Sequence, residues 1–523
     1  MSISLAPVLI CVPLLLAGCL AFAGRGRRPR FTPWLAEAAA LLALLLALLL
    51  AGSLVFAGAS PAAAWPLFHG RLDAVSATML LLVAFVGWIV VRYTRTYLDG
   101  EAGQGAFTGW LCLTLAAVLL LVSAGDLVQL LLAWVATSLF LHRLLLFYPQ
   151  RPAARRAARK KFLTARIADA ALAAGAALLL LAYGSPDIAG ILAAARAGEG
   201  GLPAVAAAAL LGLAAVLKSA QFPTHGWLTE VMETPTPVSA LLHAGVINAG
   251  GFLLIRFADV MLLAPGVLAV LVMVGGFTAL FGSLVMLTQP AVKTSLAWST
   301  VAQMGFMIFE CGLALFPLAL LHIVAHSLYK AHSFLASGGA VERVAAIRRP
   351  GPVAIPRRGA VGRAFLAACA LYLAVGALFG VAGKSPQAIA LGAILVLGVA
   401  YLLAQGFADA APRALTRRTA LYAVATSVAY FALQVAATHL TAAVLPATPA
   451  PGPLEWALLA LMAFSFGLVA VAQAMFPLWA HHPAAAGLRV HLSNGLYANA
   501  LFDRWIGAWS ARRSAPLAKE TTP

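Results

Sequence analysis

The chain has 523 residues, of which 63% are hydrophobic and only 10% are charged. Soluble proteins carry about 25% charged residues, so this composition cannot cover a water-exposed surface, and soluble enzyme folds are excluded. The formal net charge of +18 would suggest nucleic-acid binding if the basic residues formed one patch, but they stand in short loops between apolar runs. The sequence therefore predicts an all-α, polytopic membrane protein.

Apolar segments of about 20 residues, the length that spans a bilayer, follow one another along the chain. The first is followed rather than preceded by arginines, so we expect a retained span and not a cleaved signal peptide. We predict about 14–15 transmembrane helices from segments near 4–24, 34–58, 74–96, 106–124, 127–148, 162–183, 203–222, 237–258, 262–287, 291–313, 315–340, 363–383, 386–408, 419–444 and 455–479.

Basic residues fall in alternate loops, which places those loops in the cytoplasm by the positive-inside rule. This pattern predicts an outside N-terminus and a cytoplasmic C-terminus, and it accounts for most of the positive charge without nucleic acid. The run at 151–161 also suits contact with anionic lipid or an acidic partner. The basic clusters lie at 25–30, 92–95, 151–161, 343–363, 413–418 and in the tail, and the opposite loops lie at 59–73, 184–202 and 446–454.

Ionisable side chains inside the apolar segments are the candidate functional residues, because each is costly at membrane depth unless it is paired or hydrated. Most of them lie between residues 169 and 330: Asp169, Lys218, His243, Lys293, Glu310, His322, His326 and Lys330. The five cysteines form no CxxC pair, so no metal, iron–sulfur or disulfide role is expected for them: Cys11, Cys19, Cys112, Cys311 and Cys369.

Lys218 stands shortly before Pro223, which lacks a backbone donor and should break its helix near the bilayer midplane. Irregular backbone at that depth must be surrounded by protein or water. A desolvated lysine can exchange its proton near neutral pH, whereas a nearby carboxylate keeps it charged. Lys218 is therefore a candidate proton carrier, and the alternative is a lysine that snorkels to the membrane interface.

His322, His326 and Lys330 recur at intervals of four residues and so share one helix face. Three titratable groups in a stripe can pass a proton along through water. A zinc site is the less favoured alternative, because no Cys or Glu stands nearby in metal-ligand spacing. A purely structural role for the two histidines stays open. The segment 235–251 combines His243 with small residues that suit close packing around a polar pathway.

Three segments resemble the antiporter-like subunit family of respiratory complex I and its relatives. The family includes the L subunit (subunit 5), the large Mrp antiporter subunits and membrane hydrogenase subunits. The segments are KSAQFPTHGWLTEVMETPTPVSALLHAG (218–245), VKTSLAWSTVAQMGFM (292–307) and LHIVAHSLYKAHSFLASG (321–338), within a likeness that extends from about residue 60 to 400. The resemblance implies antiporter-like inverted five-helix repeats, each with a broken helix, and a chain of Lys, Glu and His across the membrane interior.

The resemblance also implies roles for individual residues. Lys218 matches the central broken-helix lysine, His243 the histidine of the next helix, Lys293 the lysine that opens its helix, His322, His326 and Lys330 the HxxxH stripe with its following lysine, and Asp169 an acidic position on the sixth helix. The fifth helix of the family usually carries Trp-Glu, but here Val135 follows Trp134. Asp169 is then the best remaining carboxylate partner for Lys218; alternatively, the coupling between this lysine and a carboxylate is altered in this chain. Lys384 is the nearby candidate for the second broken-helix lysine.

Within this family, the sequence is most similar to DabB subunits. The likeness rests on Val135, the stretch 139–152, KSPQA (384–388) and the closing segment LRVHLSNGLYANALFDRWIGAW (488–509). The lateral helix of complex I L subunits is not expected here. In the DabB family the subunit pairs with DabA, a large peripheral protein that resembles a β-carbonic anhydrase and carries zinc. The resemblance implies that proton or sodium flow drives vectorial hydration of CO2 to bicarbonate at a bacterial cell inner membrane.

We therefore expect a non-catalytic transporter subunit with no cofactor or metal of its own, zinc being confined to a DabA-like partner. The alternatives are an ion-translocating subunit of a complex I-like, hydrogenase or Mrp-type antiporter complex, and a membrane anchor for a peripheral enzyme. The expected organisation is N-terminal transmembrane helices at 1–105, an antiporter-like proton-translocating core at 106–410, C-terminal transmembrane helices at 411–480 and a cytoplasmic amphipathic tail at 481–523, which either lies on the membrane surface or docks the partner.

Overall fold

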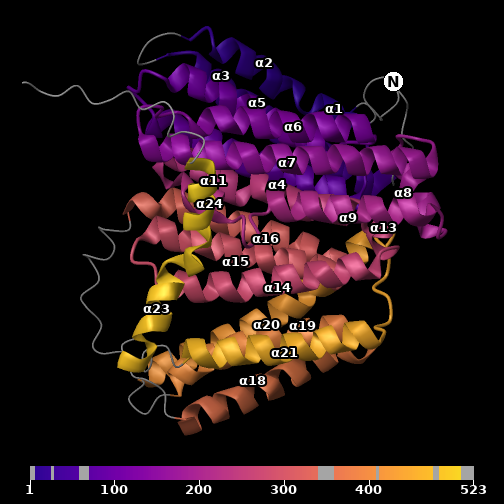
Figure 1. Cartoon of the computed structure of the whole chain (residues 1–523), viewed down its shortest axis with the longest axis vertical. Helices are drawn as coiled ribbons and strands as arrows, with labels where there is room; N and C mark the ends of the chain where they lie inside the picture. The colour runs from indigo at the N-terminus through magenta and orange to yellow at the C-terminus, as the bar shows by residue number, and fades with distance from the viewer. Residues whose placement is uncertain are drawn as a thin grey trace, which may run out of the picture.

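The computed structural model describes residues 6–24, 29–57, 70–339, 358–407, 412–474 and 482–507, and its regular structure there is helical (Figure 1). The predicted loop residues 25–28, 59–69 and 343–357 and the tail residues 508–523 lie outside this description. The helices are α1 (Ala6–Leu9), α2 (Val12–Ala21), α3 (Thr32–Ala57), α4 (Ala74–Tyr97), α5 (Gln104–Val122), α6 (Leu127–Leu145), α7 (Pro152–Tyr183), α8 (Ile188–Arg196), α9 (Gly201–Lys218), α10 (Gly226–Thr229), η2 (Val231–Glu233), α11 (Thr236–Ala244), η3 (Val246–Asn248), α12 (Ala249–Arg256), α13 (Ala258–Leu262), α14 (Pro265–Leu287), α15 (Val292–Gly312), α16 (Phe316–Leu335), η4 (Ala336–Gly339), α18 (Arg358–Leu378), η5 (Val381–Gly383), α19 (Pro386–Gly406), α20 (Arg413–Thr441), α21 (Pro453–Ala474), η6 (Pro483–Ala485), α23 (Ala486–Ser493), η7 (Gly495–Tyr497) and α24 (Ala498–Gly507).

In the described part of the chain, twelve helical segments are long and apolar enough to cross a membrane, and Pro7–Ala21 is a shorter apolar one. Two further helices have similar length but contain predicted polar residues: α15, with 21 residues, carries Lys293 and Glu310, and α16, with 20 residues, carries the predicted stripe. The prediction of an all-helical, polytopic membrane protein is therefore confirmed. The arrangement of its helices as inverted repeats stays a prediction.

The apolar interior forms one large cluster and two smaller ones. The large cluster runs from α2 to α16, and a second joins α18, α19 and α20. A third cluster links α14, α15 and α16 to α19 and α21. Figure 1 shows the result as a stack of helices in which α18 to α21 form a separate layer beside the core. Helices α2 to α16 thus share one continuous apolar core, and the C-terminal helices add two smaller clusters to it.

Glycines let the central helices approach until their backbones touch. A Cβ atom on Gly305 of α15 would lie 2.5 Å from the backbone nitrogen of Ala279 on α14. On α12, a Cβ atom on Gly250 would lie 2.5 Å from the carbonyl oxygen of Ala215 on α9. Small residues at such crossings are typical of membrane bundles, where close packing replaces the hydrophobic driving force. These contacts hold α15 against α14 and the interrupted helices α12 and α9 against each other.

Two predicted loops turn out to be helical. The basic run at 151–161 forms the first turns of α7, which begins at Pro152 rather than near residue 162. Pro at the first helical position has its φ already set for a helix. The predicted loop at 184–202 contains the short helix α8. The earlier start of α7 matters for the site, because it places two lysines of the basic run inside the bundle.

Ion pairs connect the loops at each end of the bundle. At one end, Arg151 at the start of α7 pairs with Glu233 at 3.1 Å. At the other end, Arg196 of α8 pairs with Asp259 of α13 at 2.9 Å. Figure 1 shows α8 and α13 at one end and the C-terminal helices α23 and α24 across the opposite end. The start of α7 and the tail therefore share one side, as the alternation of basic segments predicts.

Candidate functional site

The expected helix break lies directly after Lys218. Helix α9 ends at this residue, Ala220 adopts a left-handed φ of 50°, and α10 begins beyond Pro223. The Ser219 hydroxyl donates to the carbonyl of Ile247 at 3.2 Å, so this polar group at the break has a partner within the protein. The Lys218 side chain is buried at the C-terminal end of α9, where the helix dipole favours a positive charge.

The ammonium group of Lys218 contacts two side chains of α6, and neither of them is a carboxylate. Its Nζ donates to Oγ of Ser138 at 2.8 Å and lies 4.3 Å from the centroid of the Trp134 ring, a distance at which a cation is attracted to the aromatic face. A second lysine, Lys161 of α7, donates from Nζ to the carbonyl oxygen of the same Ser138 at 2.6 Å. Two buried lysines from different helices therefore share one serine.

Asp169 lies beside this cluster but pairs with a neighbour on its own helix. Its Oδ2 is 2.6 Å from the guanidinium of Arg166, and both residues line a hollow together with Val135. No ion pair joins Asp169 to Lys218 among the described residues, and their interaction is a longer-range electrostatic one. The role of Asp169 as the partner of Lys218 stays a prediction, and Val135 contributes no charge to the hollow.

His243 of α11 is the centre of a second polar cluster. Its Nδ1 lies 3.0 Å from Oγ1 of Thr300, and that hydroxyl donates to the carbonyl of Leu296 at 3.0 Å. A hydroxyl has one hydrogen, so Nδ1 of His243 is the donor. The same Leu296 carbonyl accepts from Nζ of Lys330 at 3.0 Å. His326 donates from Nε2 to the backbone carbonyl of His243 at 3.2 Å.

The predicted stripe on α16 is thus brought against α11 and α15. His322, the third member, lies 3.1 Å through Nδ1 from Oε2 of Glu310 on α15, and its ring centroid is 6.0 Å from that of His326. His322 also borders a hollow of about 410 Å3 between the core and the C-terminal helices. The stripe therefore continues from the enclosed core to a more open face.

Hydrogen bonds at the interruption between α11 and α12 lie between the two clusters. Asn248 donates from its amide to the hydroxyl of Ser327 at 2.9 Å and to the carbonyl of Ala244 at 3.0 Å. Ser327 adjoins His326, and Ser219 beyond Lys218 contacts Ile247. Polar groups therefore follow one another from Lys218 to His326 within the protein.

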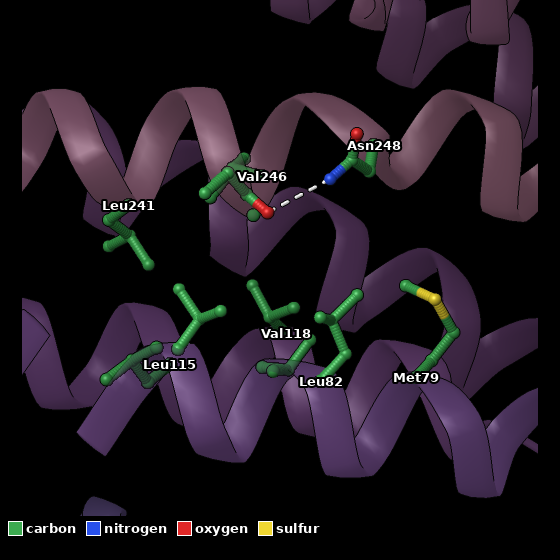
Figure 2. Close-up of a pocket in the computed structure, with 11 residues that line it drawn as sticks. Met79, Leu82, Leu115, Val118, Leu241, Val246 and Asn248 are labelled. Atoms are coloured by element: carbon green, nitrogen blue, oxygen red, sulfur yellow. Dashed lines mark hydrogen bonds between the residues drawn. The ribbon is translucent and has the colours of Figure 1, made fainter. Parts of the chain in front are cut away.

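The cavity beside this interruption is small and mostly apolar (Figure 2). Leu82 of α4 with Leu115 and Val118 of α5 lines one side, and Asn248 contributes the polar side chain. Its volume is about 10 Å3, which is close to the least that holds one water molecule. This cavity can therefore contribute one water to a polar pathway and is too small for a larger substrate.

Two of the predicted residues lie away from these clusters. Lys293, near the start of α15, donates to the Thr236 hydroxyl at 3.2 Å. Lys384 lies between η5 and α19 and donates to Oε1 of Gln434 on α20 at 2.6 Å, above the ring of Phe431. Lys384 therefore lies in the connection between the two spanning helices α18 and α19 of the C-terminal layer, and its role as the second broken-helix lysine stays a prediction.

Lys160 is a buried cation that the sequence reasoning assigned to membrane orientation. Its side chain is 0% exposed and its Nζ lies 2.7 Å from Glu230 and 2.6 Å from Asp503. Nζ also donates to the side-chain oxygen of Asn499 at 2.7 Å, and Asn499 donates to Glu230. Asp503 and Asn499 belong to α24, so this lysine holds the C-terminal tail against the bundle. The described part of the tail therefore packs on the bundle through Asn499 and Asp503 of α24.

Asp73 and Arg256 form another buried pair that the sequence reasoning missed. Arg256 ends α12 and lies 2.6 Å from Asp73, which caps the start of α4. Burial alone would raise the pKa of Asp73, but the guanidinium groups of Arg256 and Arg71 outweigh it and hold that pKa well below its usual range. The pair ties α12 to α4.

The sequence contains a signal for the charged cluster around Lys218, in the part that α7 contributes. Lys161 and Asp169 are eight residues apart and Arg166 is three before Asp169, so all three share a helix face once α7 is extended to residue 152. No group of three His, Cys, Asp or Glu side chains positioned to hold a metal ion occurs within the residues that the structure describes.

Comparisons with known proteins agree with this arrangement. Two family models match, "NADH:quinone oxidoreductase/Mrp antiporter, TM" at residues 124–349 and "NADH-Ubiquinone oxidoreductase (complex I), chain 5 N-terminus" at residues 67–108. The protein named "Probable inorganic carbon transporter subunit DabB2" from Halothiobacillus neapolitanus is 38% identical over 92% of this chain and 87% of its own length. The chain belongs to the DabB family. The resemblance inferred from the motifs is thereby confirmed.

A second DabB relative, from Hydrogenovibrio crunogenus, is 43% identical over 63% of this chain and 64% of its own length. The solved Mrp complex from Dietzia sp. DQ12-45-1b matches with a TM-score of 0.64 and 24% identity, covering 98% of this chain and 60% of that one. This likeness establishes an Mrp-like fold for the DabB-family chain. As a family member it is a multi-pass, antiporter-like membrane subunit of an inorganic-carbon transporter.

Proposed function

We propose that this chain conducts protons in an energy-coupled inorganic-carbon pump, and that the proton flow drives CO2 hydration by a DabA-like zinc partner. The observation that carries the proposal is the series of buried titratable groups from Lys218 through His243 and His326 to the Glu310–His322 pair. Each member has a hydrogen-bond or ion-pair partner in the protein. A cluster meant only for helix packing would not need five titratable side chains, each of which is costly in a membrane.

Protons suit this series better than sodium. His and Lys can each lose and regain a proton, whereas sodium requires several oxygen ligands around one position. In the proposed cycle Lys218 receives a proton, which then moves along the α16 stripe toward the Glu310–His322 pair. Zinc belongs to the partner in this proposal, and the chain itself performs no covalent chemistry.

The proposed location is a bacterial inner membrane, with the tail and the start of α7 in the cytoplasm. Basic residues gather at that end, as the positive-inside rule requires. A cytoplasmic partner would then meet the face on which α23 and α24 lie, and bicarbonate would be released where cells use it.

Growth of cells that lack carbonic anhydrase tests the proposal. The chain expressed together with a DabA-like partner should restore growth in ambient air, and neither protein alone should do so. Lys218→Ala should abolish inorganic-carbon uptake while the complex still assembles, whereas Arg156→Ala, an exposed basic position on α7, should leave uptake intact. Full uptake by the assembled Lys218→Ala complex would refute the lysine relay.

The same cells separate the alternative functions. A membrane anchor predicts that uptake survives an uncoupler and also survives substitution of both Lys218 and His326. A complex I-like, hydrogenase or Mrp-type subunit predicts ion transport that does not depend on a DabA-like partner. Either result would replace the present proposal.

A further inference from the structure

Lys161 is a buried charge for which the proposed proton path has no assigned use. It lies on α7 with 4% of its surface exposed, and its Nζ is held by the carbonyl oxygen of Ser138 at 2.6 Å. A lysine kept inside a membrane bundle is costly unless it has a function or a charge partner. Its backbone-carbonyl partner is neutral, so that hydrogen bond offsets only part of the cost of burying the charge.

Ser138 places the ammonium groups of Lys161 and Lys218 close together. Lys218 donates to the hydroxyl oxygen of this serine at 2.8 Å and Lys161 to its carbonyl oxygen at 2.6 Å. The serine is itself buried. Two positive charges that share one small residue in a low-dielectric interior repel each other strongly.

The charged groups around the pair do not cancel this repulsion. From α7, the pair faces Arg166 and Asp169, which already form an ion pair at 2.6 Å, and from α6 it faces His142. Within the described residues, these helices therefore bring one carboxylate to four basic side chains, the two lysines included. Val135 stands on α6 near Asp169 and adds no charge. The two lysines then bind their protons in coupled steps, so that gaining one weakens the hold on the other.

We propose that Lys161, acting through Ser138, is the positioning residue whose positive charge drives the proton from Lys218 during transport. A proton taken from water by Lys161 Nζ makes the pair doubly charged. Lys218 Nζ then releases its own proton to water on the side of the α16 stripe, and the pair returns to a single positive charge. In this scheme repulsion by a lysine replaces withdrawal of a carboxylate. The inference rests on the proposed role of Lys218 as a proton carrier.

Titration of Lys218 in the purified full-length chain tests the electrostatic coupling without any transport assay. The chain contains seven lysines, so 13C-labelled lysine side chains can be followed individually by NMR, and Lys218→Arg assigns the Lys218 signal by its loss. Lys161→Met should increase the proton affinity of Lys218 at least tenfold. Lys161→Arg keeps the charge and should leave that affinity near the wild-type value. An unchanged Lys218 titration in Lys161→Met would overturn the inference.

Uptake measurements with the DabA-like partner then connect this coupling to transport. Lys161→Met should reduce uptake at neutral pH about tenfold and move the pH of greatest uptake upward, and Lys161→Arg should restore the wild-type profile. A loss of uptake at every pH with an unshifted profile would indicate a merely structural residue and would refute the proposal. If the wild-type pair shows no uptake, the proposed function fails, while the NMR titration still decides whether the two lysines are coupled.

Discussion

Replacing Lys160 by methionine should release the C-terminal tail from the bundle. This side chain is fully buried and lies between Glu230 of the broken-helix region and Asp503 of α24, at 2.7 Å and 2.6 Å. Methionine fills similar space but carries no charge, so the two carboxylates would then face each other without a cation. Removing one member of a buried ionic network is more destabilising than removing the whole network, because a charge is left without compensation.

The size of the effect follows from these distances. At an effective dielectric constant of about 20, each pair has a Coulomb energy of roughly 6 kcal/mol, most of which desolvation offsets, so that breaking a buried pair costs about 3–5 kcal/mol. Glu230 and Asp503 are 20% and 30% exposed, and water therefore screens them in part. We expect tail docking to weaken by about 2–3 kcal/mol, which is roughly a 30- to 150-fold change in the docked population.

Limited proteolysis measures this population. Trypsin can cleave after Arg504 in α24 only when that helix leaves the bundle and unfolds, so the cleavage rate follows the undocked fraction. Lys160→Met should accelerate this cleavage at least 30-fold, and Lys160→Arg should accelerate it less. The control is Arg156→Met, which removes the same charge from an exposed position of α7. Cleavage of Lys160→Met at the rate of this control would refute the reasoning.

Three further predictions concern the core. Asp73→Asn should lower the free energy of unfolding by about 3–5 kcal/mol by leaving Arg256 unpaired, measured by thermal unfolding in detergent. Because the folded-state pKa of Asp73 is depressed, its stabilising effect should be full at neutral pH, begin to decline as pH falls below about 4, and disappear only below the depressed pKa; equal losses at pH 3 and pH 7 would contradict this. Gly305→Val should separate α14 from α15 and cost about 1–3 kcal/mol, and wild-type stability would show that their backbones are not in contact. Glu310→Gln should preserve assembly but reduce uptake by disrupting the His322 pair, and unchanged uptake would exclude this pair from the proton path.

Local sequence was sufficient for the part of the site that depends on one helix. Pro223 predicted the break next to Lys218, and the four-residue spacing of His322, His326 and Lys330 predicted a common face on α16. Both features are present because proline lacks a donor and an α-helix repeats about every 3.6 residues. Neither inference required knowledge of which helices are neighbours.

The partners of these residues could not be predicted in the same way. Asp169 was expected to serve Lys218, but its ion pair is with Arg166, while Lys218 meets Ser138, 80 residues away. Lys161 was assigned to a basic loop because a run of positive charge is normally solvated. Its burial depends on α6 and α9 packing against α7, which no periodicity within residues 151–161 reveals.

Composition and order along the chain by themselves determined that this protein is a helical membrane bundle, where its spans lie, and which titratable residues are candidates for function. These properties follow from hydrophobicity and helix geometry, which are local. Only the tertiary structure decided which charges meet: Lys160 is joined to Asn499 across 339 residues, and two lysines share Ser138. A buried charge needs a partner in space, and helix packing rather than sequence distance determines which side chain can provide it.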